Sequence, residues 1–155
     1  MECGEKFMAL SYFKEITVNI PRERTFELME DISRFGEWQD GFVSFEHKTG
    51  DWGEPGSTYE LHYKMQSREI EMKETLIERR APEVVRLTFE AGDAVWNSVD
   101  YTLTDNGDGT THMRLDTVFK CKGITAVMAF FMPFMFKNQT QKSLDDFKAW
   151  AEAQA

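Results

Sequence analysis

Residues that commonly bind metals or form disulfides are scarce in this sequence. Its 155 residues include only three histidines, His47, His62 and His112, and two cysteines. None of the histidines is spaced with another histidine or a cysteine as the ligands of a zinc or iron site are, so we expect no metal centre and no bound cofactor. We also expect Cys3 and Cys121 to be free thiols in a reducing compartment, although the sequence alone still allows a disulfide between them.

The motifs of several enzyme classes and of targeting segments are absent as well. The chain has no glycine-rich phosphate loop, and no Ser/His/Asp combination can be nominated from it. Residues 1–6 (MECGEK) lack the basic and apolar regions of a signal peptide. Because we also find no internal repeat, linker or integral membrane segment, we expect a single cytoplasmic domain over residues 1–155.

Positive charge is in short supply. The chain holds 18 Lys and Arg against 27 Asp and Glu, which gives a net charge of −9. The phosphates of a nucleic acid would be repelled, so we expect no nucleic-acid partner. The same balance disfavours docking on anionic lipid, and no local Lys/Arg cluster alters that expectation.

Apolar side chains, by contrast, are concentrated near the C-terminus. Residues 124–136 (ITAVMAFFMPFMF) carry no charge. This run is shorter than the roughly 20 residues that span a bilayer, yet too apolar for a helix facing solvent, so a sheet, a ligand, a membrane surface or a partner must cover it. Pro133 predicts a kink or break. Phe130 and Phe134 lie off the apolar stripes of this segment, and a cavity mouth, a homodimer contact and a transient lipid contact all remain open for them.

The rest of the chain alternates between two periodicities. Period-two alternation of apolar residues predicts strands, and apolar stripes at helical spacing predict helices. We expect strands at 8–18, 42–47, 57–65, 68–79, 85–89, 95–103 and 113–119, and helices at 22–32, 33–38 and 124–150. Short turns join the last six strands, which is typical of an antiparallel meander. Their apolar faces need a cover, and the last helix is the only long one, so we expect an α+β fold in which a curved sheet closes over it.

Several segments along nearly the whole chain resemble one superfamily. They are ITVNIP at 16–21, FELMEDISRFGEW at 26–38, Gly56, the turn within 78–87, GDGT at 107–110 and LDDFKAW at 144–150. Together they resemble the helix-grip fold of the START and birch-pollen-allergen-like (SRPBCC) superfamily, in particular its polyketide cyclase/dehydrase and lipid-transport-like members. The resemblance implies a curved seven-stranded antiparallel sheet, two short helices after the first strand, and a long C-terminal helix over the concave face.

The resemblance also implies a cavity between the sheet and the C-terminal helix. We therefore expect binding or transport of a hydrophobic small molecule or lipid. A polyketide cyclase, aromatase or dehydratase is the alternative, because some members of the superfamily catalyse such reactions. A protein-interaction module is the third interpretation, since a few members bind partner proteins.

The predicted ligand-binding residues share the inward faces of the strands and of the C-terminal segment. They are Tyr59, Leu61, Tyr63, Met72, Leu87, Phe89, Asn97, Tyr101, Met113, Leu115, Thr117, Val127, Met128, Phe131 and Met135. Flexible methionines suit a variable apolar ligand, and phenol hydroxyls can meet its polar end. The alternative is a filled core in which Met fills gaps and the phenols reach backbone partners.

Glu74 and Asn97 interrupt otherwise apolar inward faces. A carboxyl inside an apolar cavity has a raised pKa and can act as a general acid or base, so Glu74 is our candidate catalytic residue. Asn97 can orient a carbonyl group by hydrogen bonding. In the alternative interpretation, both side chains reach water or pair with Arg near the strand ends.

Overall fold

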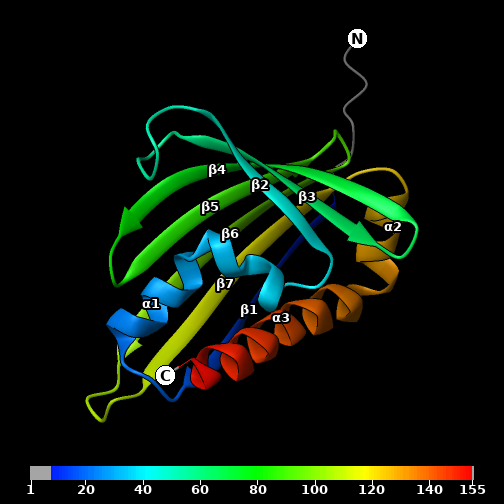
Figure 1. The fold of residues 1–155 in the computed structure, drawn as a ribbon. Helices are drawn as coiled ribbons and strands as arrows, with labels where there is room; N and C mark the ends of the chain where they lie inside the picture. The colour runs from blue at the N-terminus through cyan, green and yellow to red at the C-terminus, as the bar shows by residue number, and fades with distance from the viewer. Residues whose placement is uncertain (1–7, 155) are drawn as a thin grey trace.

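The alternating segments form seven strands, and the apolar stripes form helices on one side of them (Figure 1). The structure is a computed structural model that describes residues 8–154. Its strands are β1 (Met8–Val18), β2 (Phe42–Thr49), β3 (Thr58–Met65), β4 (Arg68–Arg80), β5 (Val84–Ala91), β6 (Val95–Asp105) and β7 (Thr111–Cys121). Its helices are α1 (Arg22–Glu30), the 3-10 helix η1 (Ile32–Glu37), α2 (Ile124–Phe131) and α3 (Pro133–Ala153).

All seven strands belong to one antiparallel sheet in the order β1-β7-β6-β5-β4-β3-β2. The chain's first strand therefore pairs with its last, and β2 forms the other edge. The sheet curves around α3, which lies across its concave side (Figure 1). The predicted α+β helix-grip architecture, a seven-stranded sheet with two short helices after the first strand and a long C-terminal helix, is confirmed.

The connection between β1 and β2 closes one end of the concave side. Pro21 precedes α1, in agreement with its fixed φ and missing N–H. Two buried hydroxyls hold this corner, since Thr25 donates to the carbonyl of Pro21 at 2.9 Å and Thr111 donates to that of Ile20 at 2.7 Å. The first short helix ends at Glu30 rather than at residue 32, and the second begins at Ile32 rather than at residue 33.

The C-terminal segment is broken where proline predicts it. Met132 has φ −132° and ψ 53°, outside the helical region, and Pro133 opens α3 in the first-turn position that proline tolerates. Tyr12 of β1 then anchors α3: its hydroxyl lies 3.0 Å from the carbonyl of Phe136 and 2.7 Å from Oγ1 of Thr140. The two halves of the apolar run therefore point in different directions, and only α3 follows the sheet.

Fully packed side chains occupy the part of the concave face over β1, β7 and β6. Val18, Leu103, Met113 and Phe147 are each at most 2% exposed there. The buried face of α3, which carries Phe147 and Ala151, packs into this region. The concave face over β2 to β5 is less densely filled, which leaves room for a cavity.

Two further expectations concern the thiols and the membrane. Cys121 is a buried free thiol, whereas Cys3 lies outside the described residues. Across residues 8–154, no helix combines the length and the apolar character needed to cross a bilayer.

Candidate functional site

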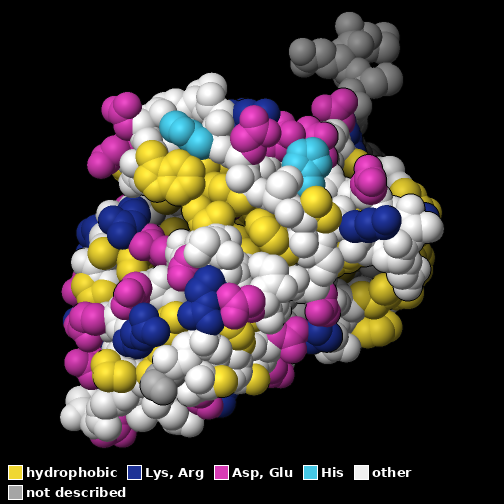
Figure 2. Space-filling model, in the orientation of Figure 1, with side chains coloured by type: hydrophobic (Ala, Val, Ile, Leu, Met, Phe, Trp, Pro, Cys, Tyr) yellow, Lys and Arg dark blue, Asp and Glu magenta, His cyan; other side chains and the backbone are white. Residues whose placement is uncertain are grey.

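A cavity of about 570 Å³ lies between strands β2 to β5 and the helix η1. Its size falls within the range of about 300–1,000 Å³ that is typical of small-molecule sites. Its lining comes from Met29, Glu30, Ile32, Phe35, Trp38, Gln39, Phe45, Trp52, Gly53, Glu54, Tyr59, Leu61, Tyr63, Glu74, Leu76, Arg79, Val85, Leu87, Phe89, Tyr101 and Ser143. Hydrophobic side chains gather between the upper strands and the short helices in the middle of the face that Figure 2 shows.

Some of the predicted ligand-binding residues meet in this cavity. Tyr59, Leu61, Tyr63, Leu87, Phe89 and Tyr101 line it, and the candidate catalytic residue Glu74 lies among them. Met72 lines an adjoining pocket of about 270 Å³, which shares Trp38, Gln39, Tyr63 and Ser143 with the cavity. Strand periodicity therefore locates the cavity wall on β3, β4 and β5.

The predicted residues of β7, and Asn97 of β6, lie outside both pockets. Met113, Leu115 and Thr117 are at most 5% exposed, because α1 and α3 fill the concave face at this end. The amide of Asn97 donates to Thr117 Oγ1 at 2.7 Å and to the carbonyl of Val118 at 3.0 Å. Its donors are committed to neighbouring strands, so the expected role of Asn97 in orienting a ligand carbonyl has no support in the geometry.

The structure does not bring the predicted residues of the apolar run to the cavity either. Val127, Met128, Phe131 and Met135 lie outside both pockets. Phe131 is 70% exposed and Val127 is 49% exposed. The physical reason is the break at Met132, which turns α2 away from the line of α3. The expectation that the run 124–136 forms the inner wall of the pocket therefore needs correction.

An aromatic group from the β1–β2 connection and from β2 completes the wall instead. Phe35 packs edge-on against Trp38 and Phe45, at ring-centroid distances of 6.1 Å in both cases, and Trp52 packs edge-on against Tyr59 at 5.3 Å. Sequence reasoning missed these residues because they belong to a short 3-10 helix and its end, an irregular strand and a loop. Their density of aromatic side chains was the available signal.

Arg79 was missed for a different reason. A β-bulge between Leu76 and Glu78 shifts the register of β4 against β5. An extra residue reverses the faces of a strand, so Arg79 pairs with the inward-facing Val85 and lines the cavity. Its guanidinium donates two hydrogen bonds to the carboxylate of Glu30, at 2.6 and 2.8 Å, and thereby links β4 to α1 at the cavity.

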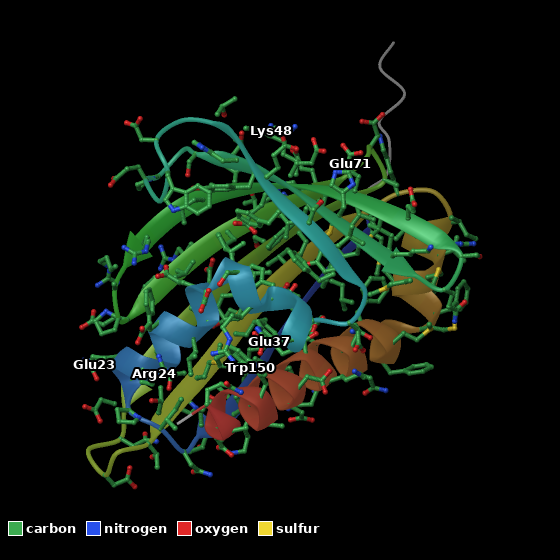
Figure 3. The ribbon with its side chains drawn as sticks, viewed as in Figure 1. Glu23, Arg24, Glu37, Lys48, Glu71 and Trp150 are labelled. Atoms are coloured by element: carbon green, nitrogen blue, oxygen red, sulfur yellow. The ribbon has the colours of Figure 1, made fainter. Side chains whose placement is uncertain are left out.

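Contacts between η1 and α3 hold the helical side of the cavity in place. Trp38 packs against Phe147 at a ring-centroid distance of 5.1 Å. The indole N–H of Trp150 donates to Glu37 at 3.5 Å, and the guanidinium of Arg34 lies 4.9 Å from the centre of the Trp150 ring. Glu37 and Trp150 can be followed where η1 meets α3 in Figure 3.

Glu74 is the chemically distinctive residue of the cavity. Its side chain is on the concave face of β4, is only 9% exposed, and has no hydrogen bond or ion pair to any residue among 8–154. Burial disfavours the charged carboxylate and raises the pKa of Glu74 to about 7. The carboxyl can therefore gain or lose a proton near neutral pH.

Two phenols face the same part of the cavity. Burial raises the pKa of Tyr101 to about 12, and burial followed by the charge of Glu74 raises the pKa of Tyr63 above its ordinary value. The hydroxyl of Tyr63 donates to Gln39 at 2.6 Å, whereas that of Tyr101 has no hydrogen bond within the described chain. The indole N–H of Trp38 is also without a protein acceptor there. The cavity thus offers a carboxyl and a phenol to a ligand.

A cluster of possible metal ligands lies on the opposite face of the sheet. Glu60, His62 and Glu71 place one ligand atom each within 4.8 Å of one another. The ammonium group of Lys48 already lies 3.6 Å from Glu60. The three possible ligands are themselves partly or fully exposed. Lys48 and Glu71 lie on the side of the sheet away from α3 (Figure 3), so the cluster is separate from the cavity.

Comparison with known families identifies one match across most of the chain. The family model described as polyketide cyclase/dehydrase and lipid transport matches residues 11–152. A comparison with curated protein sequences finds no match.

Solved structures of similar fold cover nearly the whole chain at low sequence identity. The structure of Ara h 8.0201 aligns with a TM-score of 0.72 and 13% identity over 94% of this chain and 99% of its own. An aromatase/cyclase, Zhui from Streptomyces sp. R1128, aligns with a TM-score of 0.75 and 12% identity over 93% of this chain and 94% of its own. Norcoclaurine synthase from Thalictrum flavum, in complex with dopamine and hydroxybenzaldehyde, aligns with a TM-score of 0.68 and 13% identity over 96% and 90% of the two chains. These TM-scores establish a shared fold, and at identities this low they establish the fold alone.

Proposed function

Because the chain belongs to the polyketide cyclase/dehydrase and lipid transport family, we propose that it binds a hydrophobic small molecule or lipid in the cavity between β2–β5 and η1. The observation that supports this most directly is an open cavity of about 570 Å³ with largely apolar and aromatic walls. An apolar cavity of this size favours a ligand that removes apolar surface from water.

The polar groups of the cavity define what else the ligand carries. Glu74 and Tyr101 lack protein partners within the described chain, and a polar group buried without a partner costs free energy. A ligand with one polar end, such as a hydroxyl, an enol or an amine, would supply the missing hydrogen bond. The remainder of the ligand would contact Leu61, Leu87 and Phe89.

A cavity-filling variant tests the proposal. Leu87→Trp adds a large side chain to the wall of the cavity, while Ile77→Trp adds the same side chain at an exposed position of β4 that is 49% accessible. We expect native mass spectrometry after mild purification to detect a bound apolar molecule in the wild type and in Ile77→Trp but not in Leu87→Trp. Circular dichroism should show that both variants are folded. The proposal fails if the wild type retains no such molecule and takes up no apolar fluorescent probe, or if Leu87→Trp binds as well as the wild type.

A second function, catalysis of a cyclisation or dehydration of a polyketide-like substrate, is favoured by one specific observation. Glu74 has a pKa of about 7 inside the cavity, which suits a general acid or base at neutral pH. As a base it would remove a proton from a carbon next to a carbonyl group, and as an acid it would protonate a departing hydroxyl.

Turnover measurements distinguish the enzyme from the carrier. Under the catalytic proposal, Glu74→Gln lowers kcat by about 100-fold or more while the apolar part of the cavity still binds the substrate. The wild-type rate should follow a titration near pH 7, which Glu74→Gln should abolish. Unchanged turnover of a confirmed substrate by Glu74→Gln would rule out Glu74 as the acid or base.

A further inference from the structure

An exposed apolar surface at one end of the molecule is not used by the proposed site. It consists of Ile124, Val127, Phe130, Phe131, Phe134 and Met135, which we call the α2 patch. Ile124 is 75% exposed, Phe131 70% and Phe130 63%. Hydrophobic side chains gather at the right-hand edge of Figure 2, where Figure 1 draws α2 and the beginning of α3.

The concentration of these side chains distinguishes the α2 patch from ordinary surface residues. Outside residues 124–135, five exposed large apolar residues, Phe13, Val43, Trp52, Met65 and Ile77, lie singly on different strands or loops. Isolated apolar side chains are normal on a protein surface, whereas contiguous ones mark an interaction site. Moreover, α2 contains no charged residue at all, so its exposed face has no polar side chain suited to water apart from Thr125.

The sequence segment that contains the α2 patch differs in charge from the whole protein. Residues 117–144 contain four lysines and no Asp or Glu, although the whole chain has a net charge of −9. Lys142 is neutralised by ion pairs with Asp40 and Asp146. Lys120 lies over the ring of Trp96 just before α2, and Lys137 lies 6.0 Å from the ring of Tyr12 just after the patch. The chain therefore brings positive charge, without acidic neighbours in sequence, to both ends of its exposed apolar surface.

We propose that the α2 patch docks on the surface of a lipid bilayer that contains anionic headgroups. The phenylalanine and isoleucine side chains would enter the boundary between headgroups and acyl chains, and Lys120 and Lys137 would remain at the level of the phosphates. Apolar side chains flanked by lysines are the pattern of interfacial helices. With eight residues, α2 is far too short to span the bilayer and would lie in its surface.

Charge complementarity favours a bilayer over a second copy of the chain. In a symmetric dimer the same surface meets itself, so the lysines around one patch would face those of the other. Residues 117–144 hold no carboxylate that could pair with them. An anionic lipid surface satisfies both the apolar side chains and the lysines.

The adjoining pocket of about 270 Å³ lies close to the α2 patch, which connects the docking to ligand binding. That pocket is lined by Met65, Ile70 and Met72 and by Gln139 of α3, which follows Met135 of the α2 patch by four residues, about one helical turn. A docked molecule would therefore hold this pocket near the bilayer, where an apolar ligand could pass to the main cavity. The passage of ligand rests on the proposed function, whereas the docking itself does not.

Vesicle flotation tests the docking directly. We expect the wild-type protein to float with vesicles of phosphatidylcholine containing about one third phosphatidylserine, and less with phosphatidylcholine alone. Replacing both Phe130 and Phe131 with serine should lower the partition coefficient by about 100-fold, about tenfold for each ring. Phe13→Ser, at a half-exposed ring of β1 remote from α2, is the matched control and should bind as the wild type does.

The lysines are tested separately. Replacing Lys120 and Lys137 with glutamine should reduce binding to the anionic vesicles by about fivefold for each lysine and leave binding to phosphatidylcholine unchanged. The Leu87→Trp variant should still float, which separates docking from ligand binding. The proposal is overturned if the wild type does not float, if the serine variant floats as well as the wild type, or if light scattering shows a dimer that only the serine variant dissociates.

Discussion

Replacing Glu74 with glutamine keeps the size of the side chain and removes its ability to ionise. In the folded protein this carboxyl is 9% exposed, and burial raises its pKa from an ordinary 4.5 to about 7. In the unfolded chain the same carboxyl is hydrated and titrates near its ordinary pKa. The substitution therefore measures how much folding costs the charged carboxylate.

The magnitude follows from the two pKa values. Below pH 4.5 the carboxyl is protonated in both states, and Glu74 carries no penalty. As the pH rises from 4.5 to 7, the unfolded chain releases the proton while the folded protein retains it, so the free energy of unfolding falls. Above pH 7 the loss is complete and amounts to about 3 kcal/mol, at about 1.4 kcal/mol per pKa unit. Glutamine removes this loss.

We therefore expect Glu74→Gln to be nearly neutral at pH 4.5 and to stabilise the ligand-free protein by about 3 kcal/mol at pH 8. For a chain of 155 residues this corresponds to an increase in Tm of about 6–12 °C. Urea denaturation across the pH range measures the difference. Glu69→Gln removes a carboxyl from an exposed position on the outer face of β4 and is the control. An equal effect of Glu74→Gln at pH 4.5 and pH 8 would refute the reasoning, because it would mean that the carboxyl titrates alike in both states.

Three further substitutions probe the framework of the site. Tyr12→Phe removes the hydroxyl that contacts Phe136 and Thr140 of α3, and urea denaturation should show a loss of about 1 kcal/mol; no loss would mean that this contact does not anchor α3. Gly41→Ala places a methyl group 2.4 Å from the carbonyl oxygen of Lys64 at a φ of +75°, and should lower the free energy of unfolding by at least about 2 kcal/mol; Gly53→Ala, also at positive φ but with open space, is the control. Arg79→Met breaks the partly exposed pair with Glu30 that links β4 to α1 at the cavity. Stability should change by less than about 1 kcal/mol, while a bound apolar probe should dissociate faster in stopped-flow measurements because this link is lost; an unchanged rate would show that the pair does not help to retain the ligand.

The strands could be predicted because one face of each strand is buried and the other is hydrated. In β3, for example, Tyr59 and Leu61 are buried while Lys64 is exposed. This alternation is a local property that the sequence displays directly. The order of β2 to β7 was also accessible, since short turns force consecutive strands to pair as neighbours, whereas no turn predicts the pairing of β1 with β7.

The cavity was harder to predict than the sheet, because facing inward does not decide whether a residue meets empty space. Leu87 and Met113 both face the concave side, but Leu87 lines the cavity while Met113 is 2% exposed beneath the helices. Which of them meets a void depends on where α1 and α3 pack, and no local pattern contains that information. The register shifts within β2 and the bulge before Glu78 of β4 move further side chains between faces.

The apolar run 124–136 shows how a correct local observation can lead to a wrong assignment. The run needs a cover, and the sheet has an apolar face, so pairing the two satisfies both. The structure instead breaks the helix at Met132, fills part of the concave face with α3, and leaves α2 exposed at the end of the molecule. The whole-chain charge of −9 argued against anionic lipid, but interactions between exposed charges are screened beyond about 8 Å at physiological salt, so the lysines beside α2 matter more there than carboxylates farther away than this. The cover that this run requires is therefore to be sought outside the chain, and a bilayer with anionic headgroups over apolar acyl chains matches both its apolar side chains and its lysines.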